Sequence, residues 1–237
     1  MKAKNVKTLY VLDSAYFVAE KLCKVLNIDI VYISLDDIDK IDSRYDNNAI
    51  WITQPLLCTS KKLIDSDINK IIAASKKHNA YLVFDECLAL KTCNLIENGI
   101  EINDLTMFVE SPFKAVCING ILKTSFLVTS TKTFAEIYSL SLAHIYSYYY
   151  ANLNGLTHSI EFFTSAYYDK YYAYVNNAMR KNFNIIKQLV ENRNDVTLED
   201  TYESQYISLC IKLHTNVDYG KLCKDILINT HCNVIPN

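Results

Sequence analysis

The sequence predicts an α/β fold in which helices cover both faces of a mostly parallel sheet, a three-layer α/β/α arrangement. Short apolar runs alternate with amphipathic helical stretches through the first two thirds of the chain, which is the pattern of such a sheet. Half of the 237 residues are apolar, so one sizeable core can form.

Six strands are predicted, at residues 7–12, 29–34, 49–53, 80–85, 105–110 and 124–129. A crossover helix is expected between the third and fourth strands, because isoleucines recur there at helical spacing, at positions 64, 68, 71 and 72. Asp65 or Ser66 is expected to cap the start of this helix, and basic residues at its end complement the helix dipole.

The last third of the chain is predicted to be helical from residue 131 to 195, with a break at Gly155 and a long helix over 166–194. A strand at 206–213, a helix at 219–227 and a short strand at 232–235 follow. We therefore expect an α/β domain over residues 1–150, a helical connection over 151–195 and part of a small α+β domain over 196–237.

Composition argues against several classes of function. The 24 basic residues nearly balance the 26 acidic ones, which disfavours nucleic acid or a membrane surface as partner. The chain has no apolar run long enough for a spanning helix and no secretion signal, so a cytoplasmic location is expected. The eight cysteines lack metal-binding spacing, so no metal site is expected, and the usual glycine-rich nucleotide motifs are absent.

Two strand ends carry residues with possible chemistry. Asp85 closes the strand AYLVFD, at the sheet edge where open α/β sheets bind ligands, although an acid at a strand end is more often a helix cap or a loop ligand. The next strand leads into Ser111-Pro112-Phe113-Lys114, whose lysine in isolation would be an ordinary surface residue. Cys87 is a further candidate, as a nucleophile with His78 or His144 as base or, by default, as a buried thiol.

The segments FDE (84–86) and ESPFKAVCINGILKTSFLV (110–128) resemble class I/II aminotransferases, which are fold-type I pyridoxal-phosphate-dependent enzymes. The resemblance implies that Asp85 keeps the pyridine nitrogen of the cofactor protonated and that Lys114 forms a Schiff base with its aldehyde and then moves the α-proton. Ser111 would donate a hydrogen bond to the phosphate. Lys123 lies near the position of a phosphate-binding arginine in the family.

Two earlier segments resemble the same family in the same order. ITQPLLCTS (52–60) is similar to a strand end that reads Asn-Pro-x-Asn-Pro-Thr-Gly, in which Thr59 agrees and Leu57 replaces an asparagine. LDSAY (12–16) is similar to the segment whose aromatic residue, here Tyr16, stacks on the cofactor ring. Leu88 stands where the family commonly has a tyrosine.

The resemblance implies the large domain of a transferase dependent on pyridoxal 5′-phosphate, truncated at both ends, that acts in biosynthesis on an amino acid and a 2-oxo acid. A homodimer or a complementing chain is the expected assembly, because the family's glycine-rich phosphate cup has no counterpart before Met1. The alternative is a degenerate copy without catalysis, acting as a scaffold or as a subunit of a split enzyme. The same cofactor also serves decarboxylation, elimination and racemisation.

Overall fold

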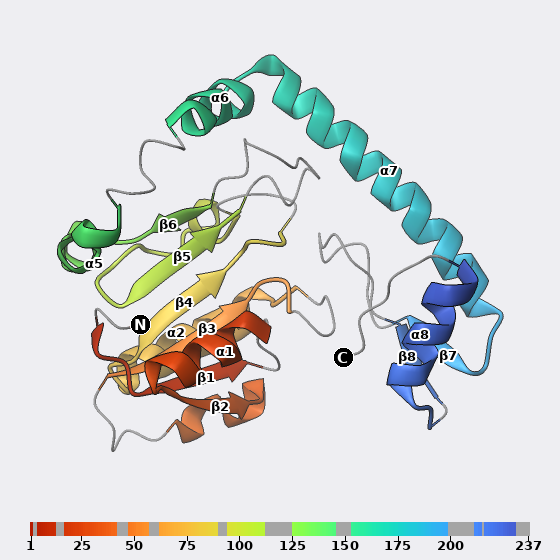
Figure 1. Ribbon diagram of the computed structural model, residues 1–237, viewed down its shortest axis with the longest axis horizontal. Coiled ribbons are helices and arrows are strands. Elements are labelled where there is room, and N and C mark those ends of the chain that lie inside the picture. The colour runs from red at the N-terminus through yellow and green to blue at the C-terminus, as the bar shows by residue number, and fades with distance from the viewer. Residues whose placement is uncertain are drawn as a thin grey trace.

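The computed structural model describes residues 1, 4–12, 17–41, 47–56, 62–89, 94–111, 125–145, 153–198, 211–214 and 216–230. Its main feature is a six-stranded sheet in the order β2-β1-β3-β4-β5-β6 (Figure 1). The strands are β1 (Thr8–Leu12), β2 (Asp29–Ile33), β3 (Asn48–Thr53), β4 (Tyr81–Asp85), β5 (Thr106–Glu110) and β6 (Phe126–Val128). They confirm the six strands that the sequence predicts to within two residues at each end.

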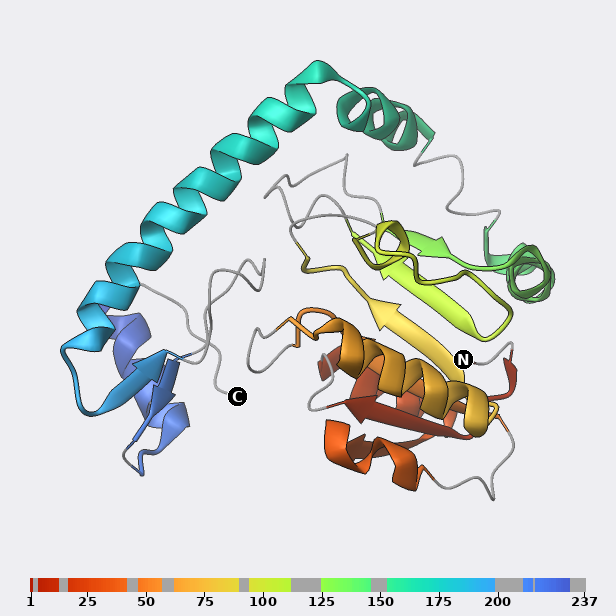
Figure 2. The same ribbon diagram turned by 180° about the vertical axis from the view of Figure 1, so that it is seen from behind.

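Strands β1 to β5 pair in parallel, whereas β6 pairs antiparallel with β5. Helix α1 (Phe17–Leu26) and helix α2 (Asp65–Lys77) lie on opposite faces of this sheet, as the two views in Figures 1 and 2 show. A 3-10 helix, η2 (Leu35–Lys40), contacts α2. The three-layer arrangement predicted from the sequence is therefore present.

The apolar core lies on both faces of the sheet. The larger part, on the α2 face, contains Ile52, Phe84 and Phe108, each fully buried, and the two phenyl rings stack with centroids 5.5 Å apart. The smaller part, on the α1 face, includes Val11 and Cys23. Because successive side chains of a strand point to opposite faces, this division also fixes the face on which each polar residue at a strand end lies.

Asparagines stand where the chain turns into the parallel strands. Asn5, Asn27, Asn47 and Asn79 precede β1, β2, β3 and β4, with φ values of 50°, 55°, 68° and 48°. This left-handed region is the one that glycine adopts most readily and that asparagine tolerates better than other residues. The whole chain has only four glycines, and asparagine takes the role at these turns.

Helix α2 begins differently from the expectation. Ile64, with φ −83° and ψ 164°, occupies the N-cap position and makes no side-chain cap hydrogen bond. The expected cap by Asp65 or Ser66 is therefore wrong. Gln54 accounts for the earlier start, because its Oε1 accepts a hydrogen bond from the Leu63 backbone N–H at 3.1 Å and holds the extended chain that enters the helix. Asp65 instead lies in the first turn, where its charge favours the helix dipole.

Three helices follow the sheet: α5 (Thr131–Ile145), α6 (Leu153–Phe163) and α7 (Ala166–Glu191). Gly155 lies inside α6, so the break expected there is wrong. The helix ends instead at Thr164 and Ser165, whose hydroxyl groups each donate to a carbonyl oxygen of the last turn at 2.7 Å. Side-chain hydrogen bonds of this kind compete with helix continuation.

Helix α7 runs from α6 to a second, smaller group of elements (Figure 1). This group contains the antiparallel pair β7 (Val196–Leu198) and β8 (Ile211–Leu213), followed by α8 (Tyr219–Thr230). The sequence missed β7, which has only three residues. Residues 206–210 and 232–235 of the predicted strands lie outside the described residues. A short helix, α3 (Asn94–Glu97), precedes β5.

Candidate functional site at the carboxyl edge of the sheet

The candidate site lies where β3, β4 and β5 end. Thr53 and Asp85 are partners in the register of β3 and β4, and Asp85 is paired with Val109 on β5. By alternation these side chains lie on the face of the sheet that α1 covers, and Ser111 follows two residues after Val109. Parallel strands therefore bring a carboxylate and two hydroxyl groups to one edge of the sheet.

Asp85 has a fixed orientation at this edge. Its side chain is buried, with 9% of its surface exposed, and Oδ1 accepts a hydrogen bond from the Cys87 backbone N–H at 3.1 Å. Its carbonyl oxygen accepts from the Gln54 N–H at 2.9 Å, so the pairing between β3 and β4 continues past the last residue of β3. These bonds hold the carboxyl group in one position, as a binding group requires.

The two hydroxyl groups differ in their partners. The Ser111 Oγ accepts from the Ser125 Oγ at 3.2 Å, which leaves the Ser111 proton free to bond elsewhere. The Thr53 Oγ1 is buried and has no hydrogen-bond partner among the described residues. Because an unpaired buried hydroxyl group costs about 1–3 kcal/mol, Thr53 is suited to a partner brought by a ligand or by another part of the chain.

The remaining predicted site residues, Tyr16, Thr59, Lys114 and Lys123, lie outside the described residues. Asp85 and Ser111 lie on neighbouring strands at the same edge, and their roles stay predictions. The sequence reasoning missed Thr53, Glu86 and Glu110, all of which are buried at or beside this edge. The signal was present in the sequence, since Glu86 directly follows Asp85 and Glu110 directly precedes Ser111.

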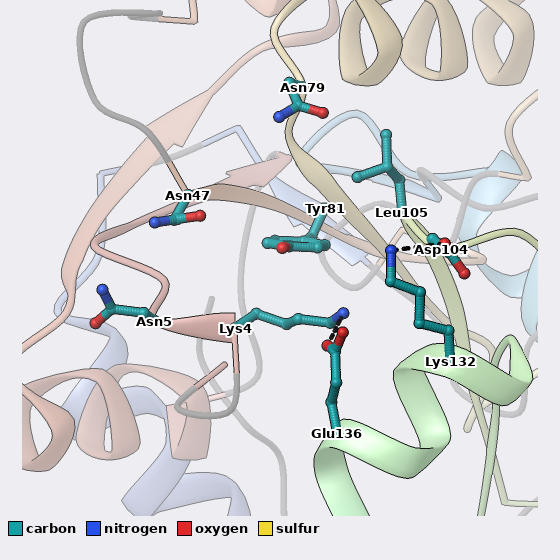
Figure 3. A pocket seen from close by; sticks show the side chains of 9 residues that line it. All are labelled: Lys4, Asn5, Asn47, Asn79, Tyr81, Asp104, Leu105, Lys132 and Glu136. Carbon is teal, nitrogen blue, oxygen red and sulfur yellow. Dashed lines mark hydrogen bonds and ion pairs between the residues drawn. The ribbon is translucent and has the colours of Figure 1, made fainter.

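A cavity of about 630 Å³ lies at the opposite edge of the sheet, before β1, β3, β4 and β5 (Figure 3). The Nζ of Lys4 is paired with the Glu136 carboxylate of α5 and lies 5.3 Å from the centre of the Tyr81 ring. Lys132 and Asp104 form a second ion pair at 3.3 Å. Because these charges already pair across the cavity, the two ion pairs connect α5 to the sheet. Neither Asp85 nor Ser111 lines this cavity.

The alternative in which His78 serves as the base for Cys87 fails on the same geometry. His78 precedes β4 and Cys87 follows it, so the two side chains lie at opposite edges of the sheet and cannot act as a base and nucleophile pair. The Cys87 thiol instead contacts the Val109 carbonyl oxygen at 3.8 Å. The side chain of His144 lies outside the description.

In the described part of the chain, no three or more His, Cys, Asp or Glu side chains gather in a way that could hold a metal ion. None of the helices found there combines the length and the apolar character needed to cross a membrane.

Comparison with solved structures identifies the fold. YbdL from Escherichia coli, whose structure and reactivity identify a methionine aminotransferase function, matches with a TM-score of 0.76 and 11% identity over 98% of this chain and 63% of its own. A PLP-dependent aminotransferase from Streptococcus suis matches with a TM-score of 0.68 and 12% identity, over 94% of this chain and 60% of its own. L-threonine-O-3-phosphate decarboxylase from Porphyromonas gingivalis matches with a TM-score of 0.71 and 10% identity, over 97% of this chain and 66% of its own.

No family model matches the chain, and no curated protein sequence matches it. The likeness therefore concerns the fold, which is that of the class I/II aminotransferases, as the sequence predicted. The chain spans between 60% and 66% of the length of these three solved structures.

Proposed function

We propose that this chain binds pyridoxal 5′-phosphate at the carboxyl edge of its sheet and acts on an amino acid as an aminotransferase, with Lys114 as the residue that holds the cofactor. The observation that carries the proposal is Asp85, a buried and oriented carboxylate at the end of a central parallel strand in a fold shared with aminotransferases.

The described residues fit the cofactor. When bound, pyridoxal phosphate supplies a protonated pyridine ring that withdraws electrons from the α-carbon of an amino acid. Asp85 is suited to accept a hydrogen bond from the ring N–H and to keep that proton in place. The Thr53 hydroxyl has no hydrogen-bond partner among the described residues. It lies on the neighbouring strand, in register with Asp85, and offers a further hydrogen bond to a ligand.

The other roles are carried over from the sequence resemblance. The Ser111 hydroxyl, already accepting from Ser125, has its own proton to donate to a phosphate oxygen. Lys114 would hold the cofactor aldehyde, and Lys123 would contact the phosphate. Tyr16 would stack on the ring, and Thr59 is a further predicted cofactor-binding residue. The amine of Lys114 would then move the proton at the substrate α-carbon, a step that general acid–base catalysis accelerates by about 10²–10⁴.

The proposed substrates are an amino acid and a 2-oxo acid. The proposed assembly is a homodimer or a complex with a complementing chain. The alternative is a non-catalytic scaffold, or an inactive subunit of a split enzyme, with the same fold. Leu88 favours this alternative, because the half-buried leucine offers no hydroxyl group at the position, three residues after Asp85, where the family commonly has a tyrosine.

Trapping with borohydride tests the proposal. The chain is incubated with pyridoxal phosphate and reduced, and mass spectrometry locates the lysine that carries the pyridoxyl group. We expect labelling at Lys114, at least about 100-fold loss of transamination in Lys114→Ala, and full labelling in the control Lys77→Ala. Lys77 is exposed at the end of α2, far from the site.

Labelling spread evenly over surface lysines, with no change in Lys114→Ala, would overturn the cofactor assignment. Labelling at Lys114 without turnover of any amino acid would favour the scaffold.

A further inference from the structure

Two glutamates are buried against each other directly beside the candidate site. Glu86 follows β4 and Glu110 is the last residue of β5, and each has only 1% of its surface exposed. The register of β4 and β5, which pairs Asp85 with Val109, sets these two side chains next to each other on the same face, where a hydrogen bond can join their carboxyl groups. The Glu86 backbone N–H also donates to the Val109 carbonyl oxygen at 2.9 Å, so the two strand ends are joined through both backbone and side chain.

A carboxyl–carboxyl hydrogen bond requires a proton, because two buried carboxylates in contact cannot both be charged. Burial, and then the neighbouring Glu110, raise the pKa of Glu86 to about 9. The groups that oppose this are the Leu95 N–H at the start of α3, which donates to both Glu86 oxygens at 3.3 and 3.4 Å, and the more distant charge of Lys62. Glu86 is therefore protonated at neutral pH and donates to Glu110.

Each member of the pair is adjacent in sequence to one predicted site residue, Glu86 to Asp85 and Glu110 to Ser111. Alternation along the strands puts Glu86 and Glu110 on the α2 face, and Asp85 and Ser111 towards the α1 face. Because these residues are adjacent in sequence, the pair and the site residues share the backbone of the same two strand ends. The Cys87 N–H that orients the Asp85 carboxylate belongs to the residue directly after Glu86.

We propose that Glu86 and Glu110 form a positioning pair that shares one proton, and that this proton holds the ends of β4 and β5 together and thereby sets the place of Asp85 relative to Ser111. The pair acts through these residues and touches no substrate. Its importance for cofactor binding rests on the proposed function, whereas its effect on the strand ends does not.

Hydrogen exchange of the Cys87 amide tests the pair without cofactor, because this N–H reports on the Asp85 contact. When the strand ends separate, Glu86 meets water and releases its proton. The opening constant of the wild-type chain should then rise by up to about tenfold per pH unit between about pH 6 and pH 8, after correction for intrinsic exchange.

Matched variants make the test specific. Glu86→Gln keeps a donor to Glu110 but has no proton to lose, so the opening constant should not change with pH. Glu110→Gln removes the second carboxyl group, which should lower the pH dependence as well. The Leu82 amide, at the other end of β4 and bonded to the Leu105 carbonyl oxygen at 2.7 Å, is the internal control. Equal pH dependence in the wild type and Glu86→Gln would overturn the proposal.

Binding of pyridoxal phosphate at about pH 7 then connects the pair to the site. We expect Glu86→Gln to bind within about threefold of the wild type and Glu86→Leu, which lacks the donor, to bind at least about tenfold more weakly. Equal binding by both variants would refute the positioning role. If the wild type binds no cofactor, the proposed function fails, and the exchange experiment still decides whether the pair exists.

Discussion

Replacing Glu86 by glutamine is expected to flatten the pH dependence of the chain's stability. The folded protein keeps the Glu86 proton up to a pKa of about 9, because burial and Glu110 disfavour its charge. In the unfolded chain the carboxyl group has its ordinary pKa of 4.5. Between these two values unfolding releases a proton, so the free energy of unfolding falls as the pH rises.

The size of this change in the free energy of unfolding follows from the difference between the two pKa values of Glu86. One proton contributes up to about 1.4 kcal/mol per pH unit. The contribution of Glu86 is complete below about pH 4.5 and lost above about pH 9. From pH 7 to pH 9 the wild type should therefore lose about 2 kcal/mol that Glu86→Gln keeps, because glutamine has no titrating proton. Taking the difference between the two chains removes the effects of the titrating groups that do not interact with Glu86.

Urea unfolding at several pH values measures this difference. Trp51, the single tryptophan of the chain, lies half-buried on β3 and provides the fluorescence signal. Circular dichroism should give the same midpoints if unfolding is two-state. Stability curves of the wild type and Glu86→Gln that stay parallel from pH 6 to pH 9 would refute the reasoning, since they would mean that Glu86 is charged in the folded protein.

Two further predictions concern packing. Lys4→Met should lower the free energy of unfolding by about 1–2 kcal/mol, because only 8% of the Lys4 side chain is exposed and its ion pair with Glu136 is lost. Lys132→Met removes an ion pair whose side chains are 69% and 49% exposed, so it should change the free energy of unfolding by less than about 1 kcal/mol in the same urea assay. Phe108→Ala should cost about 3–5 kcal/mol by leaving a cavity in the core, whereas Leu127→Ala, at an edge-strand residue 47% exposed, should cost less than about 1 kcal/mol. Equal losses within either pair would contradict the packing described above.

The local pattern of the sequence was sufficient for the central strands. Residues 81–85 form a continuous apolar run ending in an acid, and all of them except the half-buried Tyr81 are buried. A run of this kind needs cover on both faces, which only a sheet between two layers of helices provides. Asp85 and Ser111 could be placed at strand ends for the same reason, because the end of each run is visible in the sequence.

Helix boundaries were less predictable. Gly155 lies within α6 and Ile64 caps α2, although neither residue type favours these positions. In both cases hydrogen bonds from other residues decide the outcome: the hydroxyl groups of Thr164 and Ser165 end α6, and Gln54 holds the chain before α2. Such hydrogen bonds can override a local preference, because the free energy of each bond is similar in size to that of the preference.

The sequence by itself determined the fold class, the number and place of the strands in the main sheet and the strand ends that carry Asp85 and Ser111, because burial imposes a repeating pattern on neighbouring residues. Only the tertiary structure decided that β6 runs antiparallel, that Thr53 lies in register with Asp85 and that Glu86 meets Glu110. Each of these depends on which strands pair and in what register. Pairing joins residues far apart in the chain, and no short stretch of sequence records its partner.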